Sequence, residues 1–425
     1  MRVTIFAIGS RGDVQPILAL ALGMQRAGFE VTIATHANFE GFVKEQGLAF
    51  APMSGDPNGF QQTPAGRELM AAGGNPFRFM PALGKVMKEV GSSMLADAMA
   101  ATEGADALIA GPLGFVAAPI AEKRGIPVIW TALQPTYPTY SVANPMSPPG
   151  LRLGRHYNMA TYRLSQTLFM TFVRPMVREW RARLGLSGRF KLTDWIPPHR
   201  PGLYGFSPAM FPADVDWGPN AYVTGYWFLD LAESWSPPAE LLTFLDAGPT
   251  PVYIGFGSMN DKDPEGTTAI ILEALKRTGL RAVIGMGWAG IGRGDLPDGV
   301  YAIDSVPYDW LFPRMAAVVH HGGAGTVAAA LHAGKPAVCI PFLSDQPFWA
   351  HKLHTLGVSP PPIPRTRLNA DKLADALVAA TTNEAIAARA MELGETIRKE
   401  RGVENAVALI EKLLVAKSHG AVLDP

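Results

Sequence analysis

The sequence predicts an α/β fold built as two similar halves, each around a parallel β-sheet. Three observations support this prediction. The chain has 425 residues, which is enough for two or three domains with large cores. Short apolar runs typical of buried strands alternate with helical patterns through both halves, as in sheets whose strands are joined by crossover helices. Between the halves, residues 197–238 contain many prolines and glycines, which favour loops.

The first half contains four strand-like apolar runs with helical patterns between them. We expect strands at residues 3–8, 31–35, 107–110 and 127–131, and helices at residues 16–27, 39–46, 85–102 and 115–124. Residues 75–99 are rich in Met and Phe and make this connection longer than a usual crossover. They either belong to the core or line a site for an irregular apolar ligand, since methionine adapts to both.

The second half repeats the pattern. We expect strands at residues 251–255, 282–284, 300–303, 316–319 and 337–341, and helices at residues 265–277, 325–333 and 347–356. Two further helical stretches follow at residues 369–380 and 384–414, and Gly402 interrupts the second of them.

The composition excludes several classes of partner and location. The 37 Lys and Arg balance the 37 Asp and Glu, so a nucleic acid or an anionic membrane would have to bind a local surface. The single cysteine, Cys339, cannot form an intramolecular disulfide, which indicates a buried thiol in a reducing compartment. No apolar stretch reaches the roughly 18 residues of a membrane span, and Met1 leads into a strand-like run rather than a signal peptide. We therefore expect a cytoplasmic protein with no nucleic-acid partner and no transmembrane segment.

A glycine-containing loop, residues 9–16, joins the first predicted strand to the first predicted helix. Ligands of open α/β sheets bind at such loops, where glycines let them approach the backbone. Asp13 in this loop has two interpretations. Its carboxylate either caps the helix that begins near Pro16 or acts as a general base in a cleft.

A second glycine-rich loop, residues 320–326 with the sequence His-His-Gly-Gly-Ala-Gly-Thr, opens the helix that runs to residue 333. The free N–H groups at a helix start attract anions, and His320 and Thr326 can add donors to phosphate oxygens. We expect a phosphate site here, with a second phosphate-facing turn at Gly257 and Ser258.

A third loop places Asp345 and Gln346 after the strand at residues 337–341. Asp345 is either a helix cap or, together with Gln346, a ligand for sugar hydroxyls, which need both donors and acceptors.

Two other patterns do not carry the function that they suggest. Residues 285–290 match the dinucleotide fingerprint GxGxxG, but the residues after them cannot readily open a helix, so we expect no NAD site. His351 and His354 share a helix face but lack a third ligand, so we expect no metal site.

Taken together, the loops at residues 9–16, 320–326 and 345–349 resemble the signature of family 1 nucleotide-sugar glycosyltransferases. These enzymes have the GT-B fold, in which two Rossmann-like domains with doubly wound parallel sheets face each other across a cleft. Further stretches, at residues 204–208, 223–228, 285–290 and 309–313, resemble the sterol 3-beta-glucosyltransferase branch, which is related to the glycopeptide-antibiotic glycosyltransferases.

The resemblance implies a role for each part of the chain. Residues 1–210 would form the acceptor-binding domain, residues 211–237 a Pro/Gly-rich linker, and residues 238–425 the nucleotide-sugar-binding domain with its C-terminal helices.

The resemblance also implies an inverting transfer of a hexose without a required metal or cofactor. Asp13 would take the proton of the acceptor hydroxyl, and His320 would be the second catalytic residue. The residues that would bind the nucleotide sugar are Ser10, Gly12, Ser258, Trp288, Val306, His320, Gly322, Gly323, Ala324, Gly325, Thr326, Asp345 and Gln346.

The acceptor is expected to be hydrophobic, because aromatic and methionine side chains dominate the candidate residues. These residues are Met80, Met94, Trp130, Gln134, Tyr137, Tyr140 and Phe169. The resemblance favours UDP-glucose and a sterol or other terpenoid, with at most transient contact with a membrane surface. The alternative is a dTDP- or UDP-sugar transferase for a polyketide, macrolide, glycopeptide, flavonoid or glycolipid.

Overall fold

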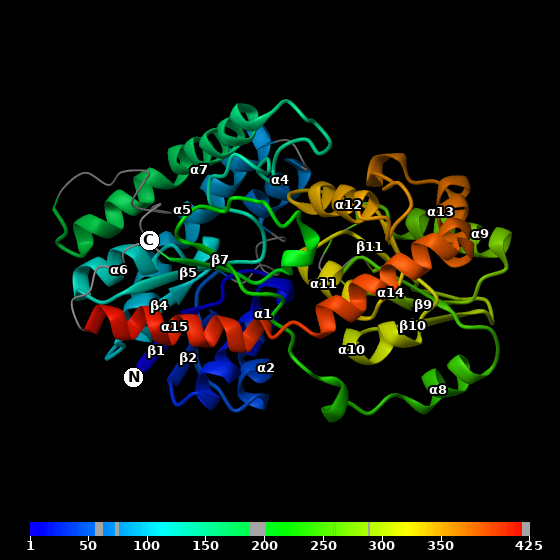
Figure 1. Cartoon of the computed structure of the whole chain (residues 1–425), viewed down its shortest axis with the longest axis horizontal. Helices are drawn as coiled ribbons and strands as arrows, with labels where there is room; N and C mark the ends of the chain where they lie inside the picture. The colour runs from blue at the N-terminus through cyan, green and yellow to red at the C-terminus, as the bar shows by residue number, and fades with distance from the viewer. Residues whose placement is uncertain are drawn as a thin grey trace. The chain divides into compact units, whose positions relative to one another are not determined.

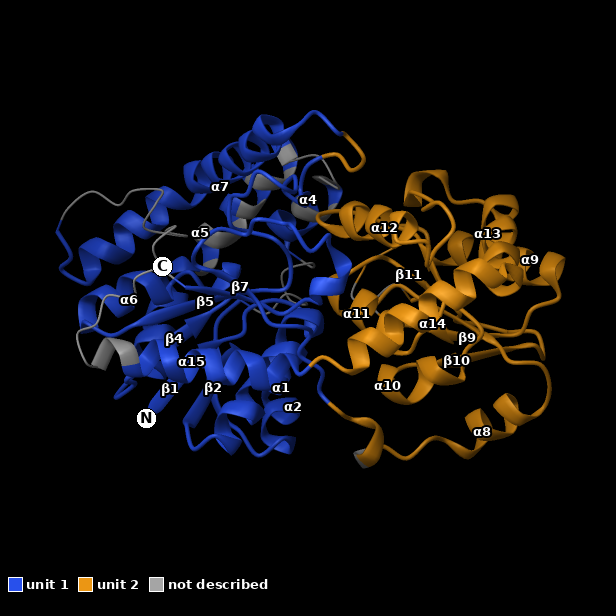
Figure 2. Ribbon diagram, viewed as in Figure 1, with its two compact units in different colours: residues 1–147, 152–229, 401–425 blue, residues 148–151, 230–400 orange. Residues whose placement is uncertain are grey.

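The computed structural model describes residues 1–55, 63–72, 76–187, 201–257, 259, 261–287 and 290–418. The chain forms two compact units (Figure 2). The first unit contains residues 1–147, residues 152–229 and the chain from residue 401 onward, and the second contains residues 148–151 and 230–400. The chain passes to the second unit after residue 229, within the stretch 211–237 that we had assigned to a linker.

The first unit is built on a parallel sheet with the strand order β3-β2-β1-β4-β5-β6-β7 (Figure 1). Its helices and strands are β1 (Arg2–Phe6), α1 (Arg11–Arg26), β2 (Glu30–His36), α2 (Glu40–Glu45), β3 (Ala49–Met53), α4 (Pro64–Ala72), α5 (Pro76–Ala101), β4 (Ala107–Ala110), α6 (Ala117–Arg124), β5 (Val128–Ala132), α7 (Arg155–Arg183), β6 (Gly202–Tyr204), β7 (Ala221–Val223) and α15 (Gly402–Ser418).

The second unit is built on a smaller parallel sheet with the strand order β10-β9-β8-β11-β12. Its helices and strands are α8 (Ala239–Asp246), β8 (Val252–Gly255), α9 (Pro264–Thr278), β9 (Ala282–Gly285), β10 (Val300–Ile303), α10 (Tyr308–Leu311), β11 (Val318–His320), α11 (Ala324–His332), β12 (Ala337–Cys339), α12 (Gln346–Thr355), α13 (Ala370–Thr382) and α14 (Glu384–Arg398).

The predicted α/β class with two parallel sheets is confirmed. The central strands β4, β5, β8 and β9 are buried along their whole length, which explains why they occur in the sequence as continuous apolar runs. Four elements, β3, β6, β7 and α7, were not expected from the sequence. The strand β3 lies at a sheet edge, contains Pro52 and is only partly buried, so it lacks the apolar pattern of a central strand.

Each sheet has one point where the strand order reverses. In the first unit the chain proceeds outward from β1 to β2 and β3 on one side, and from β4 to β7 on the other. In the second unit the reversal lies between β8 and β11. Crevices at the carboxyl ends of the strands flanking such a reversal are where open α/β sheets bind ligands. The loop with Asp13 follows β1, and the loop of residues 320–326 follows β11, so each lies at the switch point of its own unit.

The last helix, α15, belongs to the first unit, whereas we had expected it in the second domain. It packs against α1, and the Asn405 Nδ2 donates a hydrogen bond to the Thr224 carbonyl oxygen (3.1 Å). The interruption predicted at Gly402 is the place where the chain returns to the first unit. The amphipathic pattern of α15 alone does not tell which of the two cores its apolar face covers.

Candidate active site

Asp13 lies in the first turn of α1, just after β1. Ser10 rather than Asp13 is the N-cap of this helix. The Asp13 Oδ2 accepts hydrogen bonds from the Ser10 backbone N–H (2.8 Å) and from the Ser10 hydroxyl (3.0 Å). Gly9 has a φ of +140°, and a Cβ at this position would collide with the Asp13 carboxylate. The loop therefore holds this carboxylate in one orientation.

The Asp13 carboxylate combines an accessible surface with a raised pKa. The residue is exposed to solvent, and among the described residues no group donates a hydrogen bond to its Oδ1. The bulk of the surrounding protein still removes enough water to raise the pKa of the carboxyl, and this desolvation outweighs the two bonds from Ser10, which lower it. A carboxylate with a raised pKa is a stronger base, as proton abstraction from a hydroxyl requires.

The His320 side chain is fully buried, which corrects the prediction that it contacts the ligand. The Gly322 backbone N–H donates to its Nδ1 (3.0 Å), and its Nε2 lies 3.8 Å from the Sγ of Cys339. Burial, with a smaller effect from His321, lowers the pKa of His320 to about 3. The ring is therefore neutral and turned into the protein, where it fixes the start of the loop. Cys339 is buried as predicted.

His321, which the sequence analysis did not single out, is better placed for a ligand. Its Nδ1 is buried and has no hydrogen-bond partner among the described residues. A Cβ added to Gly257 would lie 3.2 Å from its Cε1, so the ring lies beside the turn that follows β8. Burial lowers the pKa of His321 to about 4, so the ring is neutral at pH 7 and can offer one N–H donor. An orphaned ring nitrogen at the switch point marks a place for a polar ligand atom.

The two buried histidines predict a loss of stability in mild acid. Their folded pKa values of about 3 and about 4 lie below the ordinary value of 6.5, so below pH 6.5 the unfolded chain binds more protons than the folded chain. Stability is therefore present above about pH 6.5 and is lost as the pH falls. Between pH 7.5 and pH 5 we expect each histidine to reduce the free energy of unfolding by about 2 kcal/mol.

Urea unfolding at the two pH values measures this effect. A His321→Asn variant, which cannot take up the proton, should show a smaller pH dependence by about that amount. An unchanged pH dependence in the variant would contradict the proposed protonation state.

The remainder of the glycine-rich loop forms the N-terminus of α11. Gly323 is the N-cap, so Ala324, Gly325 and Thr326 supply the free N–H groups of the first turn. Gly322 has a φ of +87°, and a Cβ there would lie 3.0 Å from the carbonyl oxygen of Gln346. The loops after β11 and β12 are therefore in close contact, and the helix start presents N–H groups suited to an anion.

In the loop with Asp345 and Gln346, the side-chain contacts differ from those predicted. The Gln346 Oε1 accepts hydrogen bonds from the backbone N–H groups of Phe342 (2.8 Å) and Leu343 (3.1 Å), and the side chain is buried. Its amide therefore holds the loop together, which corrects its assignment to sugar hydroxyls. Asp345 is half-buried, and its Oδ2 accepts a hydrogen bond from the indole N–H of Trp349 (3.0 Å). That bond orients the carboxylate without removing it from the surface.

Three of the residues predicted to bind the nucleotide sugar add little to the described site. Ser258 and Trp288 lie outside the described residues. The side chain of Val306 is largely buried in a core cluster with Tyr253 and Leu311, so it does not line an open surface.

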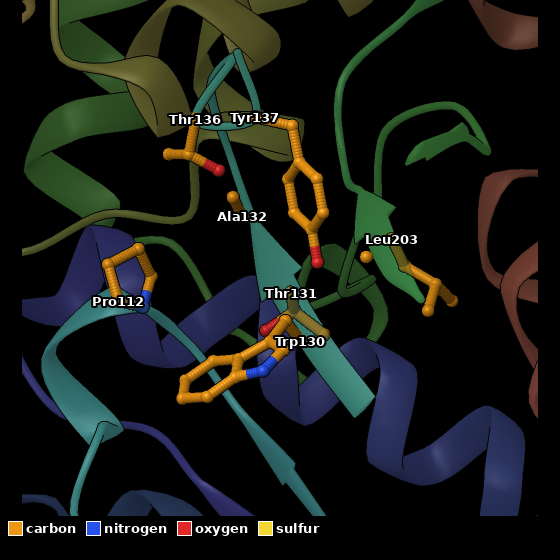
Figure 3. Close-up of a pocket in the computed structure, with 8 residues that line it drawn as sticks. Pro112, Trp130, Thr131, Ala132, Thr136, Tyr137 and Leu203 are labelled. Atoms are coloured by element: carbon orange, nitrogen blue, oxygen red, sulfur yellow. The ribbon is translucent and has the colours of Figure 1, made fainter. Parts of the chain in front are cut away.

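A small cavity lies where β5 and β6 run side by side, next to the loop that follows β5 (Figure 3). It is lined by Pro112, Trp130, Thr131, Ala132, Thr136, Tyr137, Gly202 and Leu203. Its volume is far below the roughly 300 Å³ at which pockets for drug-sized ligands begin. The Trp130 Nε1 is buried and has no partner among the described residues. Trp130 and Tyr137 therefore lie together at this cavity, which makes it a candidate subsite for the acceptor.

The other predicted acceptor residues do not line this cavity. Met94 is 1% exposed and belongs to the core of the first unit, so it offers no free surface. Phe169 is half-buried and packs against that core. Tyr140 is exposed and lies under the guanidinium of Arg155, 4.7 Å from its ring centroid. Gln134 is half-buried, and the side chain of Met80 lies outside the described residues.

Two general features are absent from the described residues. No helix among the described residues is both long and apolar enough to span a bilayer. In the same part of the chain, no three His, Cys, Asp or Glu side chains gather as a metal site would require.

Models of known protein families match parts of both units. Residues 3–142 match the N-terminal domain of glycosyltransferase family 28, and residues 287–411 match the C-terminal domain of the erythromycin biosynthesis protein CIII-like family. A sterol 3-beta-glucosyltransferase of Arabidopsis thaliana is 38% identical over 446 residues, covering 100% of this chain and 67% of the relative. A sterol 3-beta-glucosyltransferase of Cryptococcus neoformans is 36% identical over 447 residues, covering 98% of this chain but 27% of the relative.

Solved structures support the same fold. The glycosyltransferase of kitacinnamycin superposes with a TM-score of 0.73 at 21% identity, covering 97% of this chain and 99% of that one. The calicheamicin glycosyltransferase CalG4 superposes with a TM-score of 0.68 at 18% identity, covering 98% of this chain and 99% of that one. The chain has two parallel-sheet units, and all of it matches the plant enzyme. It therefore belongs to the GT-B glycosyltransferases that include the sterol 3-beta-glucosyltransferases.

Proposed function

We propose that this chain transfers glucose from UDP-glucose to the hydroxyl of a sterol or a similar terpenoid, with inversion and without a required metal. The similarity to sterol 3-beta-glucosyltransferases at 38% and 36% identity supports the acceptor class. The observation that carries the proposal is the Asp13 carboxylate at the switch point of the first unit, held through Oδ2 while no described residue donates a hydrogen bond to Oδ1.

In the proposed reaction the acceptor oxygen displaces the diphosphate directly. A bond forms between that oxygen and the anomeric carbon while the bond from this carbon to the diphosphate oxygen breaks. The hydroxyl proton passes to Asp13, whose raised pKa favours its uptake. The transition state has oxocarbenium character, and a single displacement inverts the anomeric configuration.

The leaving diphosphate accumulates negative charge, and the loop after β11 offers donors for it. The free N–H groups of Ala324, Gly325 and Thr326 and the unpartnered Nδ1 of His321 are suited to phosphate oxygens. Preorganised donors of this kind are worth about 3 kcal/mol each in a transition state. His321 takes the place that we had first given to the side chain of His320.

A screen of donors and acceptors by mass spectrometry tests this proposal. UDP-glucose and dTDP-glucose are supplied separately with sterols, flavonoids and macrolides, and hydrolysis of the donor is followed in parallel. A hexose added to a sterol from UDP-glucose is the expected result. Transfer from dTDP-glucose alone to a macrolide or flavonoid would favour the alternative, which the match of residues 287–411 to the erythromycin-type domain supports.

The cavity beside Trp130 suggests how the acceptor is held. Among the described residues the Trp130 Nε1–H has no hydrogen-bond partner, so an acceptor oxygen that reached it would gain a hydrogen bond and relieve a buried unsatisfied donor. Because the cavity is small, it would take one polar end of the acceptor rather than the whole molecule.

The Trp130→Phe variant removes this donor. We expect the KM for the acceptor to rise about three- to tenfold, with kcat and KM for the donor near wild type. The stability should fall less than in the control below, because the smaller ring leaves a void in the core but no hydrogen bond is lost. Trp180→Phe is the matched control. Trp180 is a buried tryptophan of the same core cluster, but its Nε1 donates to the Gly91 carbonyl (2.6 Å). This control should lose about 1–3 kcal/mol of stability and keep its acceptor KM. Equal acceptor KM values in the two variants would remove Trp130 from the acceptor site.

A further inference from the structure

The helix α7 and the residues before it are strongly basic in a chain with no net charge. Residues 152–183 contain Arg152, Arg155, Arg163, Arg174, Arg178, Arg181 and Arg183, and the only acidic residue among them is Glu179. A local concentration of arginine of this kind is a candidate surface for an anionic partner, whatever the charge of the whole chain.

The arginines of α7 divide between two faces of the helix. The inner face, with Tyr162, Val173 and Trp180, is buried and packs toward α5, which runs alongside (Figure 1). Arg163, Arg174 and Arg178 lie roughly 90° to 150° around the helix axis from that face, because a helix turns by about 100° per residue. All three are exposed, and they span about 22 Å along the helix axis.

These three arginines have no acidic partner among the described residues. Arg181 is used in an ion pair with Glu122, and Glu179 pairs with Arg183 (2.6 Å). The row Arg163, Arg174 and Arg178, here called the outer face of α7, is therefore an uncompensated line of positive charge.

Large apolar side chains lie exposed at the beginning of the same helix. Leu164, next to Arg163, is 55% exposed, and Leu153, just before the helix, is 65% exposed. Cations that bind phosphate beside leucines that enter the acyl region form the pattern of a surface that binds lipid bilayers. A nucleic acid would leave these leucines uncovered, and the outer face carries no aromatic ring on which a base could stack.

We propose that the outer face of α7, with Leu153 and Leu164, binds the surface of an anionic membrane. The proposal needs no transferase activity and can be tested independently of it. If the acceptor is a sterol-like lipid, such contact would let the enzyme collect it from the bilayer in which it resides.

Co-sedimentation with vesicles tests the surface on the full chain. Vesicles of phosphatidylcholine alone are compared with vesicles containing one third phosphatidylglycerol, at about 0.1 M and about 1 M salt, where the Debye length is about 10 Å and about 3 Å. The variant Arg163→Glu/Arg174→Glu/Arg178→Glu is compared with Arg26→Glu/Lys123→Glu/Lys412→Glu. The second variant changes the net charge equally at exposed positions on α1, α6 and α15.

The expected result is salt-sensitive binding to the anionic vesicles only. Removing one arginine near such a surface weakens partitioning about fivefold, so the α7 variant should bind at least about a hundredfold more weakly. The control variant should stay within a few-fold of wild type, and thermal melting should show that both variants are folded. Equal losses in the two variants, or no loss in the α7 variant, would overturn the proposal. So would wild-type binding to a single-stranded oligonucleotide with the same arginine dependence but none to the vesicles.

Discussion

Replacing Asp13 by asparagine is expected to lower kcat by about 10²- to 10⁴-fold, the range that one general base contributes. Asparagine can still accept the hydrogen bonds from Ser10 through its amide oxygen, so the loop after β1 should keep its conformation. It cannot take the proton of the acceptor hydroxyl. The affinity for the nucleotide, measured by calorimetry with UDP, should stay close to wild type. The N–H groups proposed to bind the diphosphate belong to other residues.

The chain offers a matched control for this variant. The Oδ2 of Asp97 accepts hydrogen bonds from the backbone N–H (2.8 Å) and the hydroxyl (2.5 Å) of Ser54, the same pattern as Asp13 with Ser10. Asp97→Asn should therefore reproduce any effect of altering such a structural contact, with kcat within a few-fold of wild type. If the Asp13 and Asp97 variants lose similar amounts of activity, Asp13 is a structural residue and the proposed base is wrong.

The second large effect is expected from His321→Ala, which removes the orphaned Nδ1 beside α11. A donor aimed at developing charge is typically worth about 10²- to 10³-fold in kcat, so the variant should lose turnover by this factor. The affinity for UDP should also fall, about tenfold, because the ground-state diphosphate uses the same donor. The two quantities are measured by initial rates and by calorimetry.

His354→Ala is the control for the His321 variant. His354 lies near the end of α12, and its Nδ1 is 3.0 Å from the carbonyl oxygen of Ser359. This histidine therefore already has a partner within the fold. Its removal should leave the affinity for UDP unchanged. If His321→Ala binds UDP as well as wild type does, the ring does not contact the diphosphate, and the helix start must hold it alone.

The sequence was most informative where the local pattern alone decides the structure. Strands such as β4 and β8 are buried on both faces, so their apolar runs could hardly adopt another role. The glycine-rich loops could also be located, because they follow these strands directly. The three-residue strands β6 and β7 could not be recognised, since they are too short to show a periodicity.

To tell which of the two histidines faces a ligand, the end of the strand must be known to within one residue. The apolar pattern of the sequence does not give the end that accurately. Successive residues of a strand point to opposite faces, so a shift of one residue exchanges His320 and His321. The strand was expected at residues 316–319 but β11 extends to His320, whose ring packs toward Cys339 of β12. A prediction that extended the strand by one residue would have selected His321 as the residue that leaves the sheet.

The role of Gln346 and the burial of Met94 depend on contacts between distant segments. The Gln346 amide is directed by the N–H groups of its own loop, and Met94 is enclosed by the core of the first unit. Residue type alone predicted polar and apolar ligand contacts for them, because the same side chains serve in sites and in structural networks.

The return of α15 to the first unit has a consequence for how the chain folds as it is made. Synthesis proceeds from the N-terminus, so α1 and its sheet are complete long before residues 402–418 leave the ribosome. Until then the surface of α1 that α15 covers is open, and the whole second unit is made in the interval. A chain that stops at residue 400 would therefore leave the first unit, not the second, unfinished, and the first unit expressed alone would need residues 401–418 joined after residue 229.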